Sequence, residues 1–262
     1  MIKSVYFHNP SAKGFERFAK WVLALGYHFV SLNQLTAYLR SEPISLPDKP
    51  LFVSLDDGWA GNLKLLPIME KYNIPITLFV ATEPLSSGNY WWEYVAREVG
   101  YSNLGKVKAG DYNDLLELLS NSKAKYTLNR SSMTIDQLVT FAAHSLVTIG
   151  SHTVTHPLLD KISEDQLNLE LRESKDFLET LIGCEVCAMS YPNGNFTERE
   201  IKAVGNYYNF AFTTQSGSIN KQSLHLTLNR TCLTGDVIKD VLKFIGFWQI
   251  LKQIKSKLRD VF

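Results

Sequence analysis

Short apolar runs alternate with helix-period segments along most of the chain. Residues 51–55 and 76–80 are continuous apolar runs of strand length, and a helical pattern at 63–71 separates them. Apolar runs without polar alternation are typical of strands buried on both faces, as in a parallel sheet with helical crossovers. The pattern therefore predicts an α/β fold built from βα units.

The rest of the chain supplies more units of this kind. Strands are also predicted at 4–7, 28–30, 146–149, 186–191 and 209–213, and helices at 15–23, 33–40, 134–143 and 163–183. The last helix is marked at both ends. Ser163 and Gln166 have the spacing of a capping box, and Gly183 suits a left-handed helix end.

One segment interrupts the alternation. Residues 84–132 contain the pair Trp91-Trp92 and a stretch rich in Ser, Asn and Lys at 120–132. We expect an insertion over the core here rather than another βα unit. The predicted organisation is a single domain over residues 1–245 with this insertion, followed by a basic amphipathic helix at 246–262.

Composition and charge narrow the class of protein. With 262 residues, 45% hydrophobic and 20% charged, the chain is ordinary for one folded domain. Its 27 basic and 26 acidic residues nearly cancel, so no overall field favours nucleic acid. We see no signal-peptide pattern and no apolar stretch of about 18 residues, and the three cysteines fit a reducing compartment. We expect a cytoplasmic protein.

The C-terminal segment from residue 237 to 262 interleaves apolar side chains with lysines. Such an amphipathic helix can rest on an anionic membrane surface, which here would be the inner face of the membrane. It can equally pack on the domain and expose its lysines. The sequence leaves both alternatives open.

Two adjacent carboxylates stand where a predicted strand ends. Asp56 and Asp57 follow the run 51–55, and Gly58 permits a sharp exit. Functional groups of parallel βα domains gather at the carboxyl ends of the strands. Two carboxylates this close raise each other's pKa unless a cation relieves the repulsion. The pair is a candidate metal or catalytic site, although Asp-Gly is also a common turn.

Two histidines strengthen the metal interpretation. His152 and His156 lie just after the strand predicted at 146–149, and Pro157 follows them. Two neutral imidazoles and one carboxylate form the three-ligand set of a catalytic zinc site, with positions open for water and substrate. The metal would polarise a carbonyl and acidify a water, and the second carboxylate would take the proton.

Three ordered motifs resemble those of the polysaccharide deacetylase family, the NodB-homology enzymes of carbohydrate esterase family 4. Residues 54–58, Ser-Leu-Asp-Asp-Gly, resemble its T-F-D-D-G motif, and residues 151–156, Ser-His-Thr-Val-Thr-His, resemble its H-[ST]-x-x-H motif. Residues 190–194, Ser-Tyr-Pro-Asn-Gly, resemble the later part of its R-x-P-Y-G motif. Apart from the insertion, the likeness runs from about residue 2 to residue 245.

The resemblance implies a distorted (β/α) barrel of the NodB type and a hydrolase that removes an N-acetyl group from an amino sugar. By position, Asp56 corresponds to the catalytic base. Asp57, His152 and His156 correspond to ligands of a divalent metal, for which we expect Zn²⁺. The backbone N–H of Asn193 corresponds to an oxyanion donor.

Two departures from the family pattern leave roles open. The family arginine that holds the base would fall at Ser190, so it is absent, and Arg230 is our candidate replacement. The leucine–histidine motif that supplies the general acid is also not cleanly present. His8, which follows the first predicted strand, and His225, within Leu-His-Leu, are the two candidates. The strand-end position favours His8.

Several side chains are candidate sugar contacts. Trp59, Trp91 and Trp92 have flat apolar faces that suit sugar rings, and Tyr191 and Asn193 belong to the third motif. Core packing is the alternative for each tryptophan.

The predicted function is that of a metal-dependent amidohydrolase acting on an amino sugar in a saccharide or glycan precursor. The saccharide would be linked to a nucleotide or, if the C-terminal helix contacts the membrane, to a lipid. A deformylase of a lipid-linked formamido sugar fits the same motifs. A catalytically silent carbohydrate-binding relative would fit the missing arginine.

Overall fold

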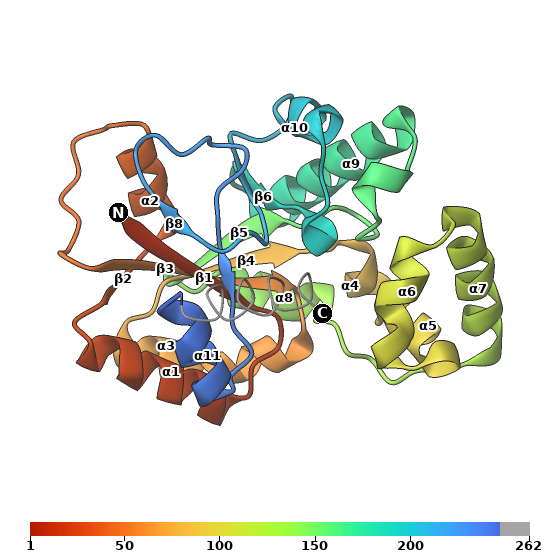
Figure 1. The fold of residues 1–262 in the computed structure, drawn as a ribbon, viewed down its shortest axis with the longest axis horizontal. Helices are drawn as coiled ribbons and strands as arrows, with labels where there is room; N and C mark the ends of the chain where they lie inside the picture. Colours follow the sequence, from red (N-terminus) through yellow and green to blue (C-terminus); the bar gives the residue numbers. More distant parts are fainter. Residues whose placement is uncertain (247–262) are drawn as a thin grey trace, which may run out of the picture.

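A curled sheet forms the centre of the molecule, which a computed structural model describes over residues 1–246 (Figure 1). Its strands follow the order β7-β6-β5-β4-β3-β1-β8, and β2 pairs with β3 while β9 pairs with β1. The strands are β1 (Ile2–Phe7), β2 (His28–Val30), β3 (Pro50–Asp57), β4 (Ile76–Val80), β5 (Val147–Ser151), β6 (Ala188–Ser190), β7 (Phe210–Phe212), β8 (Ser218–Ile219) and β9 (Thr231–Cys232).

Parallel pairing dominates this sheet. Strand β8 runs antiparallel to β1, whereas the other ladders of the described chain are parallel. Every residue of β3 and β4 is buried, as expected for strands covered on both faces. The predicted α/β fold with a curled, barrel-like parallel sheet is confirmed. Because the strands are parallel, β1, β3, β5 and β6 bring their carboxyl ends to one edge.

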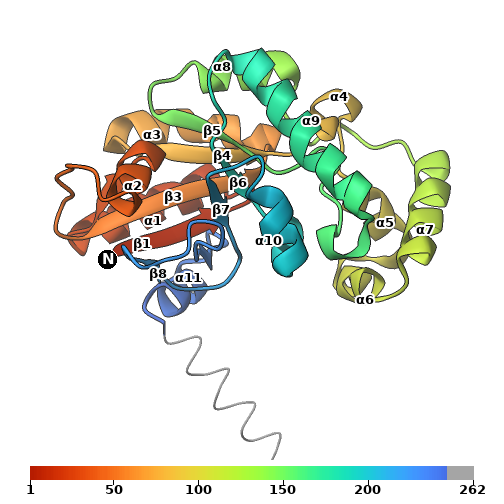
Figure 2. The same cartoon turned by 90° about the horizontal axis from the view of Figure 1, so that it is seen from above.

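Helices cover the sheet on both sides (Figure 2). They are α1 (Ala12–Ala24), α2 (Leu32–Leu39), η1 (Ala60–Leu65), α3 (Leu66–Tyr72), α8 (Ile135–Ala142), η3 (Leu159–Lys161), α9 (Glu164–Ile182), η4 (Pro192–Gly194), α10 (Glu198–Val204) and α11 (Val237–Phe244). Helix α9 begins and ends as predicted. The Ser163 side chain accepts from the Gln166 N–H, and Gly183 has a φ of +70°.

The strand predicted at 186–191 is shorter in the structure. At its start, side chains of α9 satisfy the backbone of Val186 in place of a neighbouring strand. The Val186 N–H donates to Glu179 at 2.8 Å, and Lys175 donates to the Val186 carbonyl at 2.8 Å. Strand β6 therefore begins only at Ala188.

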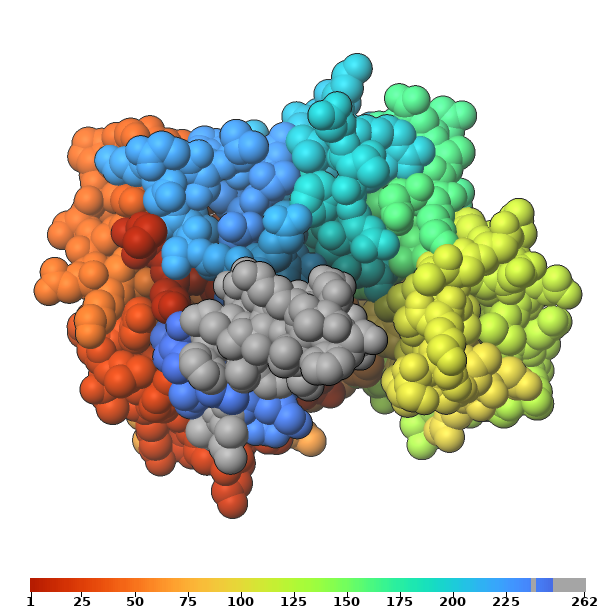
Figure 3. Space-filling model, viewed as in Figure 1, coloured from red at the N-terminus to blue at the C-terminus, as the bar shows by residue number. Residues whose placement is uncertain are grey.

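The segment between β4 and α8 is helical and lies at one end of the molecule (yellow in Figures 1 and 3). It contains α4 (Glu83–Ser87), α5 (Trp91–Val99), η2 (Tyr101–Asn103), α6 (Leu104–Ala109) and α7 (Tyr112–Lys125). A small apolar cluster of its own holds it together, formed by Trp91, Val95 and Leu115 with Leu158 of the main domain. We refer to residues 83–125 as the helical insertion.

The C-terminal end of the described chain packs on the domain. Phe244, at the end of α11, lies 5.0 Å from Trp21 and 5.1 Å from Tyr27 between ring centres. The basic helix predicted at 246–262 lies, except for Gly246, outside the described residues. Within residues 1–246 no helix has both the length and the apolar character needed to cross a membrane.

Candidate metal and catalytic site

One pocket of about 430 Å³ gathers the motif residues at the carboxyl edge of the sheet. Strand β3 supplies the two carboxylates, the loops after β1, β5 and β6 supply most of the other polar groups, and helices α5 and α6 contribute from the helical insertion. The pocket is lined by Tyr6, His8, Asp56, Asp57, Trp59, Trp92, Lys108, His152, His156, Tyr191, Asn193 and Thr214. Residues far apart in sequence therefore share one cavity.

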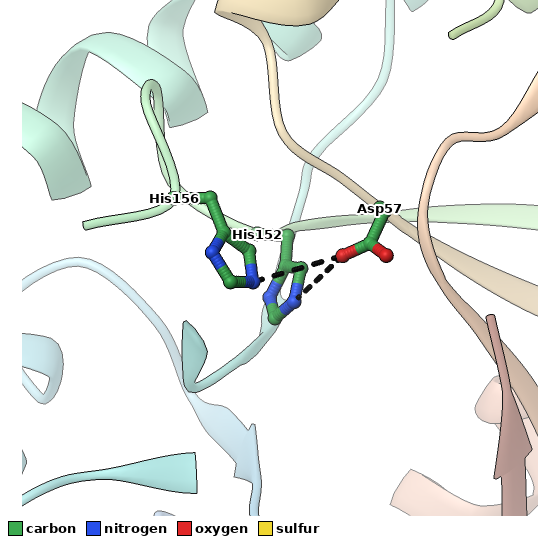
Figure 4. Close-up of side chains that lie close together, drawn as sticks. All are labelled: Asp57, His152 and His156. Carbon is green, nitrogen blue, oxygen red and sulfur yellow. Dashed lines mark ion pairs between the residues drawn. The ribbon is translucent and has the colours of Figure 1, made fainter. Parts of the chain in front are cut away.

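Asp57, His152 and His156 converge on one point of this pocket (Figure 4). Asp57 Oδ1 lies 3.5 Å from His152 Nε2 and 3.7 Å from His156 Nε2. The three candidate ligand atoms all lie within 4.8 Å of one another, and all three residues are buried. This arrangement fits three ligands around one cation.

Neighbouring groups orient these ligand atoms. His152 Nδ1 lies 2.7 Å from the Ser190 carbonyl oxygen. Because a carbonyl can only accept, Nδ1 donates in this hydrogen bond, and Nε2 is the ring nitrogen that faces Asp57. The Trp59 indole N–H donates to Asp57 Oδ2 at 2.7 Å, which leaves Oδ1 facing the imidazoles.

The chemistry of the donor set also fits a metal. Asp57 Oδ1 is buried and finds no hydrogen-bond partner among residues 1–246. Such an orphaned oxygen is costly unless a ligand satisfies it. Burial, together with His152 and Lys108, holds the pKa of His156 well below its usual value, so this ring is neutral at neutral pH. Neutral imidazoles and a carboxylate are ligands for Zn²⁺ and related ions.

The backbone of the site is unusually strained. Six non-glycine residues of the described chain have a left-handed φ, and four of them lie here: Asp57 (+78°), Thr153 (+68°), His156 (+57°) and Asn193 (+57°). Such conformations cost about 1–3 kcal/mol each and persist where the surrounding structure fixes them. Their concentration here indicates that side-chain direction is fixed for function.

A buried glutamate of α9 fixes the histidine loop. Glu170 accepts from the backbone N–H groups of Val154 and Thr155 at 2.8 and 2.9 Å, and from the Thr155 hydroxyl at 2.6 Å. These bonds hold the loop between His152 and His156. Glu170 carries no sequence signal of this role, because its burial on a helix otherwise rich in exposed charges depends on the tertiary structure.

Asp56 is bound on both oxygens by Arg230. Arg230 Nη1 donates to Asp56 Oδ1 at 2.7 Å, and Nη2 donates to Asp56 Oδ2 at 2.9 Å. This paired geometry is the strong form of a guanidinium–carboxylate contact. The arginine missing from the third motif thus has a counterpart on a different segment, and the structure places our candidate replacement against Asp56.

The guanidinium of Arg230 is fully buried and has a partner for each of its five donors. Besides the two bonds to Asp56, it donates to Ser54 Oγ at 2.9 Å, Ser190 Oγ at 2.5 Å and the Thr213 carbonyl at 3.2 Å. Its central carbon lies 4.3 Å from the ring centre of Tyr6. Ser190, where the family has arginine, therefore accepts a bond from the replacement.

This contact keeps the Asp56 carboxylate ionised. Burial alone would raise the pKa of Asp56, but the charge of Arg230, helped by His152 and His8, outweighs the burial and lowers it. Asp56 is therefore ionised at neutral pH and able to accept a proton.

The two candidate general acids lie in different places. His8 follows β1 and lines the pocket, where its ring meets Tyr6 edge-on at 5.5 Å. The surrounding site partly removes water from the ring, which lowers its pKa, but hydrogen bonding to Cys232 and the charges of Asp57 and Asp56 raise it to about 9. His8 is thus protonated at neutral pH.

The structure does not bring His225 to the site. Its ring packs at 5.2 Å on Phe210, the first residue of β7, so it lies at the amino end of a strand whose carboxyl end faces the pocket. Leu-His-Leu gave no signal for the direction from which this segment approaches the sheet.

The three tryptophans that are candidate sugar contacts lie in different surroundings. Trp59 and Trp92 line the pocket, and Trp92 packs 4.5 Å from the His156 ring. Trp91 does not line it: its side chain is 8% exposed and belongs to the insertion's core. Its indole N–H donates to the His156 carbonyl at 2.9 Å. Trp91 therefore holds the loop that carries His156 and does not offer its ring to a sugar in the pocket.

Tyr191 and Asn193, both candidate sugar contacts, line the pocket, but Tyr191 is only 1% exposed. Its hydroxyl donates to the Leu226 carbonyl at 3.0 Å, so the Tyr191 side chain mainly anchors the loop. Asn193 accepts a hydrogen bond from Lys108 of the helical insertion. Lys108 is a second residue that sequence analysis missed, because nothing in the insertion's pattern shows which lysine faces the pocket.

Solved structures share this fold at low sequence identity. The Streptococcus pyogenes deacetylase PplD, in complex with acetate, has a TM-score of 0.64 and 19% identity, covering 91% of this chain and 96% of that chain. IcaB from Ammonifex degensii has a TM-score of 0.67 and 17% identity, covering 93% and 98%. These likenesses establish the fold alone.

Sequence comparisons give the relationship itself. A Bacillus subtilis (strain 168) protein named "Putative polysaccharide deacetylase YxkH" is 21% identical over 220 residues, which are 83% of this chain and 63% of that protein. The chain thus spans less than two thirds of this relative's length. The family model described as polysaccharide deacetylase matches residues 44–210, well over half of the chain. With the site geometry and the fold, this match shows that the chain belongs to the polysaccharide deacetylase family.

Proposed function

We propose that the protein is a metal-dependent amidohydrolase that removes an N-acetyl group from an amino sugar of a saccharide or glycan precursor. The observation that carries the proposal is the division of labour between Asp56 and Asp57. One carboxylate is ion-paired with Arg230, and its neighbour faces His152 and His156 with an unsatisfied oxygen.

Asp57, His152 and His156 would hold the metal. A divalent cation bound by them would polarise the acyl carbonyl and lower the pKa of a water molecule. Trp59 and Ser190 would keep the ligand atoms in place, through the indole bond to Asp57 and the carbonyl bond to His152.

Asp56 acts as the general base in this proposal. It is ionised and held by Arg230 within the same pocket, so it can take the proton of the attacking water. A base held rigidly by two bonds loses little orientation on substrate binding.

His8 is then the general acid that protonates the leaving amine. Its raised pKa keeps a proton available at neutral pH, and it lies in the same pocket. The Asn193 segment, with its left-handed φ, would direct a backbone N–H at the developing oxyanion. Trp92 and Trp59 offer aromatic faces for the sugar ring.

An Asp56→Asn variant tests the proposal. Wild-type and variant protein, loaded with Zn²⁺, are incubated with acetylated and formylated amino sugars, and mass spectrometry detects loss of either acyl group. We expect loss of acetyl with the wild type and a rate about 10²- to 10⁴-fold lower with Asp56→Asn, because the proton acceptor is gone. Metal content should stay unchanged.

The outcomes separate the alternatives. The exposed carboxylate Asp48 gives the matched control, since Asp48→Asn changes the same group away from the pocket. Full activity of Asp56→Asn would contradict the base assignment. Loss of formyl instead of acetyl would identify a deformylase, and saccharide binding without release of either group would identify a silent binding protein. The cytoplasmic location and the membrane contact of the C-terminal segment remain predictions.

A further inference from the structure

The helical insertion places a positive charge in the wall of the pocket. Lys108, on α6, lines the same cavity as the carboxylates and the histidines. Its Nζ lies 5.4 Å from the ring centre of Trp91 and 5.9 Å from that of Trp92, so the two indoles flank the ammonium group. The lysine is therefore held over the site.

This charge lacks a carboxylate partner. Within residues 1–246, the ion pairs of the structure do not include Lys108. Burial lowers the pKa of Lys108, and the charge of Asp57 in the same pocket opposes that shift. Burying a cation without a counterion costs free energy. This cost favours an anion from outside the protein as the partner of the Lys108 ammonium group.

An unsatisfied hydrogen-bond donor lies beside it. Asn193 Oδ1 accepts from Lys108 Nζ, which leaves the amide nitrogen of the same side chain for another partner. That nitrogen, Asn193 Nδ2, is buried and finds no hydrogen-bond acceptor within the described chain. Asn193 also lines the pocket. An ammonium and an amide N–H next to each other require oxygen acceptors, and negatively charged oxygens satisfy both best.

We propose that Lys108 and Asn193 form a recognition site for an acidic group on the substrate, a phosphate or a carboxylate carried by the amino sugar near its acyl group. The proposal rests on the proposed function, since it names the substrate class of the same pocket. The insertion then determines specificity: its helix α6 supplies the charge, while the sheet supplies the catalytic groups. Lys108 is a specificity residue in this scheme and takes no proton from the reaction.

Three sugars that share the N-acetylglucosamine ring test the charge preference. N-Acetylglucosamine is the neutral probe, N-acetylglucosamine 1-phosphate carries phosphate, and N-acetylmuramic acid carries a carboxylate. Binding to the Zn²⁺-loaded protein is measured by titration calorimetry, and acetate release is measured in parallel. Wild type, Lys108→Met, Lys108→Arg and Lys106→Met are compared. Lys106 is the matched control because it is an exposed lysine of the same helix.

We expect the wild type to bind at least one acidic sugar more tightly than the neutral one. Lys108→Met should weaken that binding about 10- to 100-fold, the range for a hydrogen bond to a charged group, and leave the neutral probe nearly unchanged. Lys108→Arg should retain most of the preference, and Lys106→Met all of it. The phosphate and carboxylate arms show which acidic group is recognised.

Three results would overturn the inference: no preference for either acidic sugar in the wild type, an unchanged preference in Lys108→Met, or an equal loss for neutral and acidic sugars. The last would mean that Lys108 only holds the Asn193 loop. The two readouts separate this inference from the proposed function. Acetate release without charge preference keeps the function alone, whereas Lys108-dependent binding without acetate release keeps the recognition site alone.

Discussion

The two adjacent carboxylates of the site have opposite surroundings. Asp56 has an arginine on both oxygens, and its pKa is lowered. Asp57 has one oxygen fixed by Trp59 and the other left facing two imidazoles without a hydrogen-bond partner in the described chain. A carboxylate that is paired with an arginine on both oxygens stays ionised and can accept a proton. A carboxylate with an unsatisfied oxygen can bind a cation from outside.

The largest expected effect comes from removing the partner of Asp56. Arg230→Met leaves the Asp56 carboxylate buried without its countercharge, which should lower the free energy of unfolding by about 3 to 5 kcal/mol. Urea denaturation followed by circular dichroism measures the loss. Arg172→Met is the control because Arg172 is exposed. The double variant Asp56→Asn/Arg230→Met should recover part of the stability, and a loss below about 1 kcal/mol in the single variant would contradict the assigned pairing.

The second expected effect concerns Asp57, the carboxylate with an unsatisfied oxygen. Asp57→Asn removes a buried charge that lacks a full set of partners, so the metal-free protein should change in stability by no more than about 1 kcal/mol. The wild type should instead gain about 2.7 kcal/mol when free Zn²⁺ reaches 100 times its dissociation constant. Thermal unfolding with and without Zn²⁺ measures both quantities. An Asp57→Asn protein that Zn²⁺ stabilises as strongly as the wild type would show that Asp57 is not a ligand.

The smallest expected effect concerns the support of the metal ligands. Trp91→Phe keeps the aromatic packing but removes the indole bond to the His156 carbonyl, which should cost about 1 kcal/mol of stability. Zinc affinity should fall with it, since His156 loses a fixed backbone. Trp21→Phe, at a tryptophan that packs on Phe244, is the control for the ring change itself. Equal zinc affinity in both variants would remove Trp91 from the supporting role.

Local sequence predicted much of the fold and the centre of the site. The apolar runs 51–55 and 76–80 are buried strands, because continuous hydrophobicity of strand length has few other solutions in a βα chain. Asp56 and Asp57 end strand β3, and His152 and His156 follow strand β5. They lie together because parallel strands share one edge for their carboxyl ends.

The parts that escaped prediction depend on distant contacts. Glu170 and Lys108 reach the site from helices, and a helical pattern does not show which loop its polar face meets. His225 was a candidate by its neighbours in sequence, yet the direction of its segment sends the ring to Phe210. Arg230 was the candidate replacement for the family arginine, but its local sequence did not distinguish it from a surface or structural arginine, because its bond to Asp56 spans 174 positions.

The separation of Asp56 and Arg230 in the sequence matters for folding. Arg230 immediately precedes β9, which pairs with β1, so the countercharge arrives with one of the last strands in the chain. Until this strand docks, Asp56 lies in the interior without its partner, and burying it alone is unfavourable. A chain that ended before residue 230 would therefore bury the Asp56 carboxylate without its countercharge, and we expect it to be less stable than the full chain.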